Sequence, residues 1–229
     1  MLNTIRRIKR RLKRIGLHYH VSKRDNVRVI GSEYGGFAVC VDFINQDSIV
    51  YSFGLGEDIS FDLGMIENFG CCVKGFDPTP RSIEWLNKQV LPPNFSYEAI
   101  GLADYDGDLT FAMPEEKSWV SISSVLEQYE NTDRIVLPVN RLSTIMRTHR
   151  NGRIDVLKMD IEGTEYAVID DFLSEHIYPT QIVLEFHHLF KGVGYEKTNR
   201  AIRLLNDAGY ELFYISDIGL EMSFLRVEE

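Results

Sequence analysis

The feature of this sequence that most restricts its fold is an alternation of short apolar runs with amphipathic segments. The apolar runs have the length of strands and lie at 48–53, 71–76, 96–101, 154–159 and 181–186. In segments 58–69 and 80–90, which separate the first three runs, apolar residues recur at helical spacing. Strands that alternate with helices form a parallel sheet covered by helices. We therefore expect an α/β domain with a mostly parallel, doubly wound sheet.

Both ends of the chain depart from this alternation. Near the C-terminus, strand-like runs at 212–216 and 222–227 flank a turn-forming segment, which predicts an antiparallel hairpin that closes the sheet. Near the N-terminus, segment 26–43 has two β-prone runs separated by three glycines, which predicts a hairpin before the main sheet. The remaining expected elements are helices at 141–147, 166–173 and 201–208, a short strand at 109–112 and an irregular loop at 118–131.

Composition indicates a folded, soluble protein. The apolar fraction of 44% and the charged fraction of 26% are ordinary for a globular domain. The three cysteines lack CxxC spacing, so neither a disulfide framework nor a zinc site is expected. No apolar run approaches the ~18 residues of a membrane span, and no signal-type apolar region follows the basic N-terminus. We expect a cytoplasmic protein, at most peripheral to a membrane surface.

The first 14 residues form a basic arm. They contain seven lysines and arginines and no acid, whereas the whole chain has a net charge of −9. Ile5, Ile8, Leu12 and Ile15 recur within this arm at the spacing of a short cationic amphipathic helix. Such a helix can contact an anionic membrane, dock on a protein or nucleic acid, or remain solvated and offset the acidic body. The acidic body itself is not expected to bind nucleic acid.

A glycine turn follows the first strand of the main sheet. It includes Gly54 and Gly56, and glycine at such a turn lets the backbone approach a ligand closely. The third glycine of G-x-G-x-x-G is absent because Ile59 occupies its place, so the dinucleotide fingerprint is incomplete. A tight turn without any ligand is the alternative interpretation.

An acid ends the next strand. Asp77 lies 21 positions after Gly56 and precedes Pro78. A carboxylate at this place can accept hydrogen bonds from both hydroxyls of a ribose. The alternative is that Asp77 only caps the following helix. The two roles are compatible.

The segment 154–165 combines a buried strand with several charged residues. Asp160 lies at the carboxyl end of this strand, where open α/β sheets bind ligands, and Lys158 faces the same side. A lysine in an apolar central strand is costly unless it is paired or used, so we assign functions to Lys158 and Asp160. For Glu165, we prefer the simpler interpretation that an acid in the first turn complements the helix dipole.

A glutamate and two histidines end the next strand. Glu185 and His187 share one face by alternation, and histidine titrates near neutral pH. His187 is the candidate base that accepts a hydroxyl proton, with Glu185 as its orienting partner.

With these residues in view, the chain resembles the FkbM family of methyltransferases, including its methyltransferase-24-like branch, over roughly residues 48 to 190. Segment 157–165, LKMDIEGTE, is close to the family's L-K-x-D-x-E-G-x-E block. Segment 76–78 is similar to the family's F-E-P, with aspartate in place of glutamate, and YSFGLGEDISF at 51–61 looks like the YSFGxGxDxSF form of the branch. Ser52 stands where many relatives have aspartate, and Asp58 is a candidate to supply that carboxylate.

This resemblance implies a class I Rossmann-like fold and S-adenosylmethionine (SAM) as the cofactor. The closing hairpin distinguishes such methyltransferases from nicotinamide-binding Rossmann domains. The implied domain covers 46–229, after an appendage of basic helix and β-hairpin at 1–45. The cofactor-binding candidates are Ser52, Phe53, Gly54, Leu55, Gly56, Asp58, Asp77, Pro78, Ala103, Asp104 and Asp160.

The expected reaction is methyl transfer from SAM to a hydroxyl of a sugar, glycoconjugate or related small molecule, as relatives of this kind perform. Lys158 or Asp160 would hold the acceptor beside His187 and Glu185. A divalent metal such as Mg²⁺ is a further option, with Asp160, Glu162 and Glu185 as candidate ligands. The alternatives are a noncatalytic adapter with a degenerate SAM site and a nicotinamide-dependent oxidoreductase.

Overall fold

The computed structural model describes residues 19–113, 124 and 132–227. The basic arm, and all of the expected loop at 118–131 except Ser124, lie outside these residues. None of the described helices is long and apolar enough to cross a membrane.

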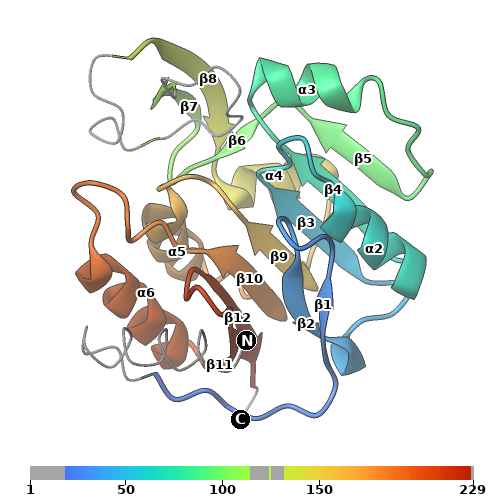
Figure 1. Cartoon of the computed structure of the whole chain (residues 1–229), viewed down its shortest axis with the longest axis vertical. Helices are drawn as coiled ribbons and strands as arrows, with labels where there is room; N and C mark the ends of the chain where they lie inside the picture. The colour runs from blue at the N-terminus through green and yellow to red at the C-terminus, as the bar shows by residue number, and fades with distance from the viewer. Residues whose placement is uncertain (1–18, 114–123, 125–131, 228–229) are drawn as a thin grey trace.

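The core of the molecule is a seven-stranded sheet in the order β11-β12-β10-β9-β3-β4-β5 (Figure 1). Strand β12 is antiparallel to both of its neighbours, and the other pairs are parallel. This arrangement confirms the expected doubly wound sheet with a closing hairpin. The strands are β3 (Ile49–Phe53), β4 (Cys72–Phe76), β5 (Phe95–Glu98), β9 (Val156–Met159), β10 (Gln181–Glu185), β11 (Tyr210–Ile215) and β12 (Glu221–Arg226).

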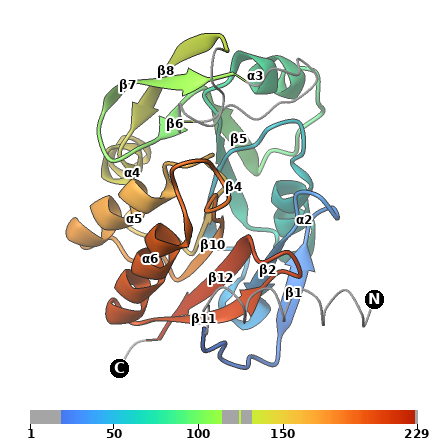
Figure 2. The ribbon, with the colours of Figure 1, turned by 60° about the vertical axis from the view of Figure 1, so that its left-hand side comes forward.

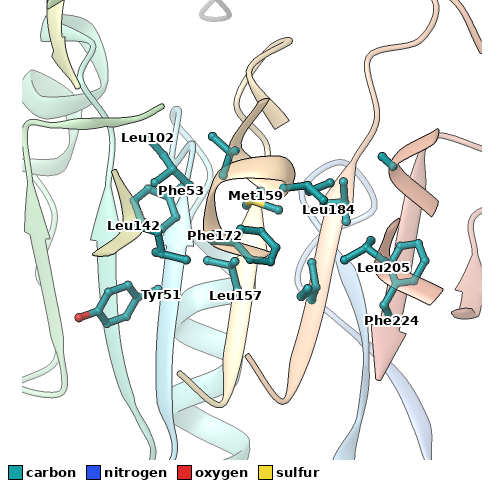
Figure 3. Packing of buried hydrophobic residues seen from close by; sticks show 14 of the residues in the cluster. Tyr51, Phe53, Leu102, Leu142, Leu157, Met159, Phe172, Leu184, Leu205 and Phe224 are labelled. Atoms are coloured by element: carbon teal, nitrogen blue, oxygen red, sulfur yellow. The ribbon is translucent and has the colours of Figure 1, made fainter. Parts of the chain in front are cut away.

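One face of the sheet packs against three helices. Alternate side chains of the central strands, including Tyr51, Leu157 and Leu184, point to this face and meet helix side chains such as Phe172 (Figure 3). All of these side chains are buried. The helices are α4 (Leu142–His149), α5 (Glu165–Ser174) and α6 (Tyr195–Asp207).

The opposite face carries the intervening side chains, including Val50, Val156 and Val183, and packs against helices α2 (Ser60–Phe69) and α3 (Pro80–Leu86). The N-terminal hairpin, β1 (Val27–Ile30) and β2 (Phe37–Cys40), shares this cluster and is followed by a short 3-10 helix, η1 (Val41–Phe43). The buried side chain of Gln181 bonds both the backbone N–H and the carbonyl of Cys40. These bonds tie the hairpin to the main sheet.

Helix α3 is shorter than the expected 80–90. It ends at Leu86, and Val90, which was expected to face the core, is 99% exposed. Pro92 and Pro93 follow closely. A proline disfavours the helical conformation at the residue before it. The helix therefore ends although the apolar residues continue at helical spacing.

A small three-stranded sheet, in the order β6-β8-β7, lies beside the main sheet (Figure 2). Its strands are β6 (Gly101–Leu102), β7 (Gly107–Ala112) and β8 (Arg134–Asn140). The sequence did not predict β8. This strand contains Pro138, which cannot donate a ladder hydrogen bond and weakens the sequence signal for a strand.

Candidate functional site

A cavity of about 770 Å³ opens at the carboxyl ends of the central strands. The strand order reverses between β3 and β9, and open α/β sheets bind ligands at such a point. The loops after β3, β4, β9 and β10 contribute to its wall, together with the β1–β2 loop and the C-terminal hairpin.

The glycine turn lies in the wall of this cavity. Gly54 lies very close to the loop that follows β9. Gly54 has a φ of +79°, and a Cβ atom there would lie 1.7 Å from the backbone oxygen of Asp160. Its N–H donates to the carbonyl of Phe76 at 3.0 Å. Gly56 also has a positive φ, of +55°. Glycine at position 54 is therefore required by backbone packing as well as by any ligand.

Asp77 links the glycine turn to the loop after β4. Its Oδ2 accepts the N–H of Gly56 at 2.9 Å, and its Oδ1 accepts the N–H and the hydroxyl of Thr79 at 2.8 and 2.6 Å. Asp77 is only 4% exposed but lines the cavity, as does Pro78. The carboxylate thus organises the start of α3 and retains acceptor capacity for ribose hydroxyls.

Asp58 joins the glycine turn to the N-terminal hairpin. Its Oδ2 accepts the hydroxyl of Ser32 at 2.6 Å and its Oδ1 accepts the N–H of Ser60 at 2.8 Å. Burial raises the pKa of Asp58, but the hydrogen bonds from Ser32 and Ser60 outweigh burial and lower it. Asp58 is therefore a carboxylate in the cavity wall that holds the β1–β2 loop against the glycine turn.

Three candidate catalytic residues lie close together in the wall of the cavity: Asp160, Glu185 and His187. One ligand-type atom from each of Asp160, Glu185 and His187 lies within 4.8 Å of the other two. Nε2 of His187 is 3.7 Å from Asp160 Oδ1 and 3.5 Å from Glu162 Oε2. His187, rather than Glu162, thus completes the group formed with Asp160 and Glu185.

The partner of His187 differs from the expected one. Nδ1 of His187 lies 3.1 Å from Oε1 of Glu165, and the same oxygen accepts the His187 N–H at 2.9 Å. Glu165 is fully buried. It is this residue, not Glu185, that orients the imidazole; Glu165 does lie in the first turn of α5, as expected, but it has this further role. Its place in the L-K-x-D-x-E-G-x-E block was the sequence signal for a more specific role.

The acids around His187 shift its charge state. Burial lowers the pKa of His187, but Glu165, Glu162 and Asp160 outweigh burial and raise it to about 10. Burial and the neighbouring charge of Asp160 raise the pKa of Glu185 to about 8. These shifts favour the protonated form of His187 at neutral pH and make Glu185 a carboxyl group that titrates well above its usual range.

Lys158 lines the cavity, and its ammonium is bonded to the backbone of the glycine turn. It is 4% exposed, and its Nζ donates to the carbonyls of Gly54 at 2.6 Å and Phe53 at 3.4 Å. Ser52 is completely buried below the turn. Lys158 therefore holds the backbone of the glycine turn in place.

Two of the expected cofactor-binding residues, Ala103 and Asp104, do not line the cavity. Ala103 packs in the core of the small sheet, and Asp104 is exposed. The cavity wall is formed instead by Gly101 and Leu102, which directly precede them. The sequence also missed Tyr34 of the β1–β2 loop and Glu221 of the terminal hairpin, both of which line the cavity.

The fold and this cavity define the class I methyltransferase architecture, an α/β sheet with a ligand site at its switch point and a closing antiparallel strand. The chain belongs to the FkbM family: the family model described as "Methyltransferase FkbM domain" matches residues 47–212.

Two curated relatives are similar to part of the chain. "Probable methyltransferase-like protein 24" of Homo sapiens is 28% identical over 146 residues, which are 62% of this chain and 33% of that protein. The protein of the same name from Rattus norvegicus is 28% identical over 141 residues, 60% of this chain and 32% of its own length. The chain spans about a third of the length of these relatives.

Solved structures with a similar arrangement have little sequence in common with the chain. Aeropyrum pernix fibrillarin with natively bound S-adenosyl-L-methionine is 12% identical with a TM-score of 0.46, and covers 90% of this chain and 84% of its own. Methanococcus jannaschii fibrillarin, a pre-rRNA processing protein, is 10% identical with a TM-score of 0.49, and the shares covered are 92% and 88%.

Proposed function

We propose that the protein transfers the methyl group of SAM to a hydroxyl oxygen of a sugar, a glycoconjugate or a related small molecule. One observation carries this proposal. The glycine turn and Asp77 line the same cavity as Asp160, Glu185 and His187, so a cofactor side and a proton-accepting side face one space. Membership of the FkbM methyltransferase family supports the choice of SAM.

The two sides of the cavity have separate tasks. The turn at Gly54 and Gly56, with Asp77, would bind the adenosyl part of SAM, because a turn without side chains lets a nucleoside approach the backbone closely and a carboxylate can accept its ribose hydroxyls. In the reaction, the acceptor oxygen forms a bond to the methyl carbon while the carbon–sulfur bond breaks, and S-adenosylhomocysteine leaves. Such a displacement depends mainly on alignment, which can contribute ~7–11 kcal/mol.

The hydroxyl proton needs an acceptor close to the reacting oxygen. Glu185 fits this role better than His187, because its pKa of about 8 lies near neutral pH whereas that of His187 is raised to about 10. The protonated imidazole of His187, fixed by Glu165, would stabilise the negative charge that develops on the acceptor oxygen. We therefore assign the role of base to Glu185 on β10 in place of His187, the candidate from the sequence.

The same three groups fit a divalent cation. Nδ1 of His187 is held by Glu165, which leaves Nε2 facing Asp160, and histidine ligands are commonly held in this way by a carboxylate. Two ionised carboxylates and a neutral imidazole suit Mg²⁺ or Mn²⁺, so a bound cation would replace the protonated His187 and the Glu185 base described above and would not act beside them. When bound, such a cation would act as a Lewis acid on the acceptor hydroxyl.

The polar side of the cavity supports a hydroxylated acceptor. Carboxylates of Asp160, Glu162 and Glu185 are placed to accept hydrogen bonds from neighbouring hydroxyls, as a sugar offers. The rings of Tyr34 and Phe190 line the same space and offer apolar surface to a ring. This combination is the reason for naming a sugar or glycoconjugate.

Calorimetry with SAM, S-adenosylhomocysteine and NAD tests the cofactor, and transfer of labelled methyl from SAM to a panel of glycosides tests the acceptor. We expect binding of SAM and of its product but not NAD, with label recovered as an alkali-stable methyl ether. Binding of NAD alone would favour an oxidoreductase. Binding of none of the three would favour a noncatalytic adapter.

A further inference from the structure

Glu221 lies opposite Glu185 in the wall of the cavity. The two residues are register partners on the antiparallel strands β12 and β10, and both line the cavity. Opposed residues of an antiparallel pair point to the same face of the sheet, with Cβ atoms about 4.5–5.5 Å apart. Two acids in this arrangement repel each other when both are ionised. The closing hairpin therefore adds a second carboxyl group beside the residue to which we assign the role of base.

Glu221 has an oxygen without a hydrogen-bond partner. Its Oε2 is buried, and no donor among the residues described reaches it. A buried carboxylate oxygen without a donor costs free energy, and each such group in a folded protein calls for an explanation. Because this side chain lines the cavity, a bound molecule can supply the donor.

The backbone fixes the position of Glu221 at the start of β12. Its N–H donates to the hydroxyl of Ser216 at 3.3 Å, and its carbonyl accepts the N–H of Ser216 at 2.9 Å. Ser223, two residues further on the same face of the strand, donates to the carbonyl of Ala38 at 2.8 Å. The Glu221 side chain therefore points to the side of the sheet that carries the β1–β2 hairpin, whose Tyr34 also lines the cavity.

A metal ion is not the partner that the geometry favours for Glu221. Among the described residues, the close group of ligand-type atoms consists of Asp160, Glu185 and His187, and Glu221 is not part of it. An ionised carboxylate only accepts hydrogen bonds, so its partner has to be a donor. In a cavity that takes a hydroxylated substrate, that donor is a hydroxyl group.

We propose that Glu221 is a substrate-binding residue that selects molecules with two neighbouring hydroxyl groups. One hydroxyl lies at Glu185 and is methylated, and the hydroxyl on the next carbon donates to Glu221. Adjacent strands thus hold the two oxygens of a vicinal diol. This inference names a feature of the substrate and rests on the proposed function. It does not involve the glycine turn or Asp77, so the affinity for SAM should not depend on Glu221.

Kinetics with matched substrates test this role. The probes are the methyl glycosides of glucose, galactose, mannose and rhamnose, each with the deoxy analogues that lack one hydroxyl next to the methylated one. We expect the loss of one such hydroxyl to lower the wild-type kcat/KM about tenfold or more, because a hydrogen bond to a charged group is lost. In Glu221→Leu the parent glycoside should lose a similar factor, mainly through KM. Removing the hydroxyl should then cost no more than about two- to threefold, because both changes remove the same interaction.

Stability separates substrate binding from a structural role. Glu221→Leu removes a buried oxygen that has no partner among the described residues, so its melting temperature should equal or exceed that of the wild type. Calorimetry should give the same affinity for SAM. Glu221→Gln, which keeps the shape, is the second variant and should also keep its stability. Asp217→Asn is the matched control, because Asp217 is exposed in the same hairpin and does not line the cavity.

Equal losses on removal of the hydroxyl in the wild type and in both Glu221 variants would overturn the inference. A lower melting temperature in both variants would also overturn it, because the carboxylate would then be structural. If the wild type methylates the glycosides without preferring a neighbouring hydroxyl, the inference fails and the proposed function stands. If the wild type methylates none of them, the proposed function fails and the inference fails with it.

Discussion

The imidazole of His187 is held by Glu165, whose Oε1 lies 3.1 Å from Nδ1 and also accepts the backbone N–H of His187. The other carboxylate oxygen of Glu165 accepts the N–H of Gly163 at 2.9 Å. Glu165 is completely buried at the start of α5. One carboxylate thus ties the loop after β9 to the end of β10 and directs Nε2 into the cavity.

Glu165→Gln should therefore lower methyl transfer by about 10- to 100-fold, as loss of a carboxylate that orients a histidine commonly does. The amide preserves the shape but removes the charge that keeps His187 protonated. Turnover of labelled SAM measures the effect. The control is Asp170→Asn, which removes an acid on the same helix that pairs with Arg200 at the surface. Equal turnover in Glu165→Gln and wild type would contradict the assigned role.

Gly54→Ala should destabilise the protein and abolish SAM binding. A Cβ atom would lie 1.7 Å from the Asp160 carbonyl, and the left-handed φ alone costs about 1–2 kcal/mol for an L-residue. Urea unfolding measures the stability and calorimetry the affinity. Gly152→Ala, where no atom lies within 4 Å of the added Cβ, should change the unfolding free energy by no more than about 0.5 kcal/mol. Similar stabilities of the two variants would refute the close approach.

Asp77→Asn should weaken SAM binding by roughly ten- to a hundredfold, because hydrogen bonds to a charged group contribute about 1.5–3 kcal/mol. Asparagine has one acceptor oxygen, so it cannot hold Gly56 and Thr79 while also accepting two ribose hydroxyls. Asp104→Asn is the matched control, since Asp104 is exposed and does not line the cavity. A larger effect at Asp104 than at Asp77 would place the ribose elsewhere.

In the metal-dependent alternative, removal of divalent cations should lower methyl transfer and added Mg²⁺ or Mn²⁺ should restore it, because Asp160, Glu185 and a neutral His187 supply a suitable ligand set. Turnover after EDTA treatment and dialysis measures this effect. Asp160→Asn should lose the response to added metal. Full activity in EDTA would remove the cation from the mechanism while leaving Glu185 as the base.

His188 should make the metal-free protein less stable as the pH falls from about 6.5 to about 4. Burial, aided by the neighbouring His187, lowers the pKa of His188 to about 4. The unfolded chain therefore takes up a proton in this window before the folded protein does, and stability falls by up to about 3 kcal/mol. His188→Gln should flatten the decrease in urea unfolding between pH 7 and pH 4. Parallel curves for the two proteins would disprove the assignment.

Much of the fold follows from local patterns in the sequence. The alternation around Val50 and Tyr51 assigns successive side chains to opposite faces of a strand, and the helical stripes supply the layers above and below. Strand β8 was not predicted because Pro138 interrupts its pattern. Helix α3 is shorter than predicted because prolines follow it. These errors concern single elements and leave the architecture unchanged.

From the sequence alone one can predict the strands and helices of the main sheet, the glycine turn after its first strand, and the position of Asp77, Asp160 and His187 at one edge of the sheet. These follow from periodicity and from the rule that parallel strands end at a common edge.

The partners of the buried charged side chains could be identified only in the folded structure. His187 pairs with Glu165, 22 positions away, and Lys158 reaches the Gly54 carbonyl across 104 positions. Periodicity assigns a side chain to a face, but distance, burial and the resulting charge state depend on which elements pack together.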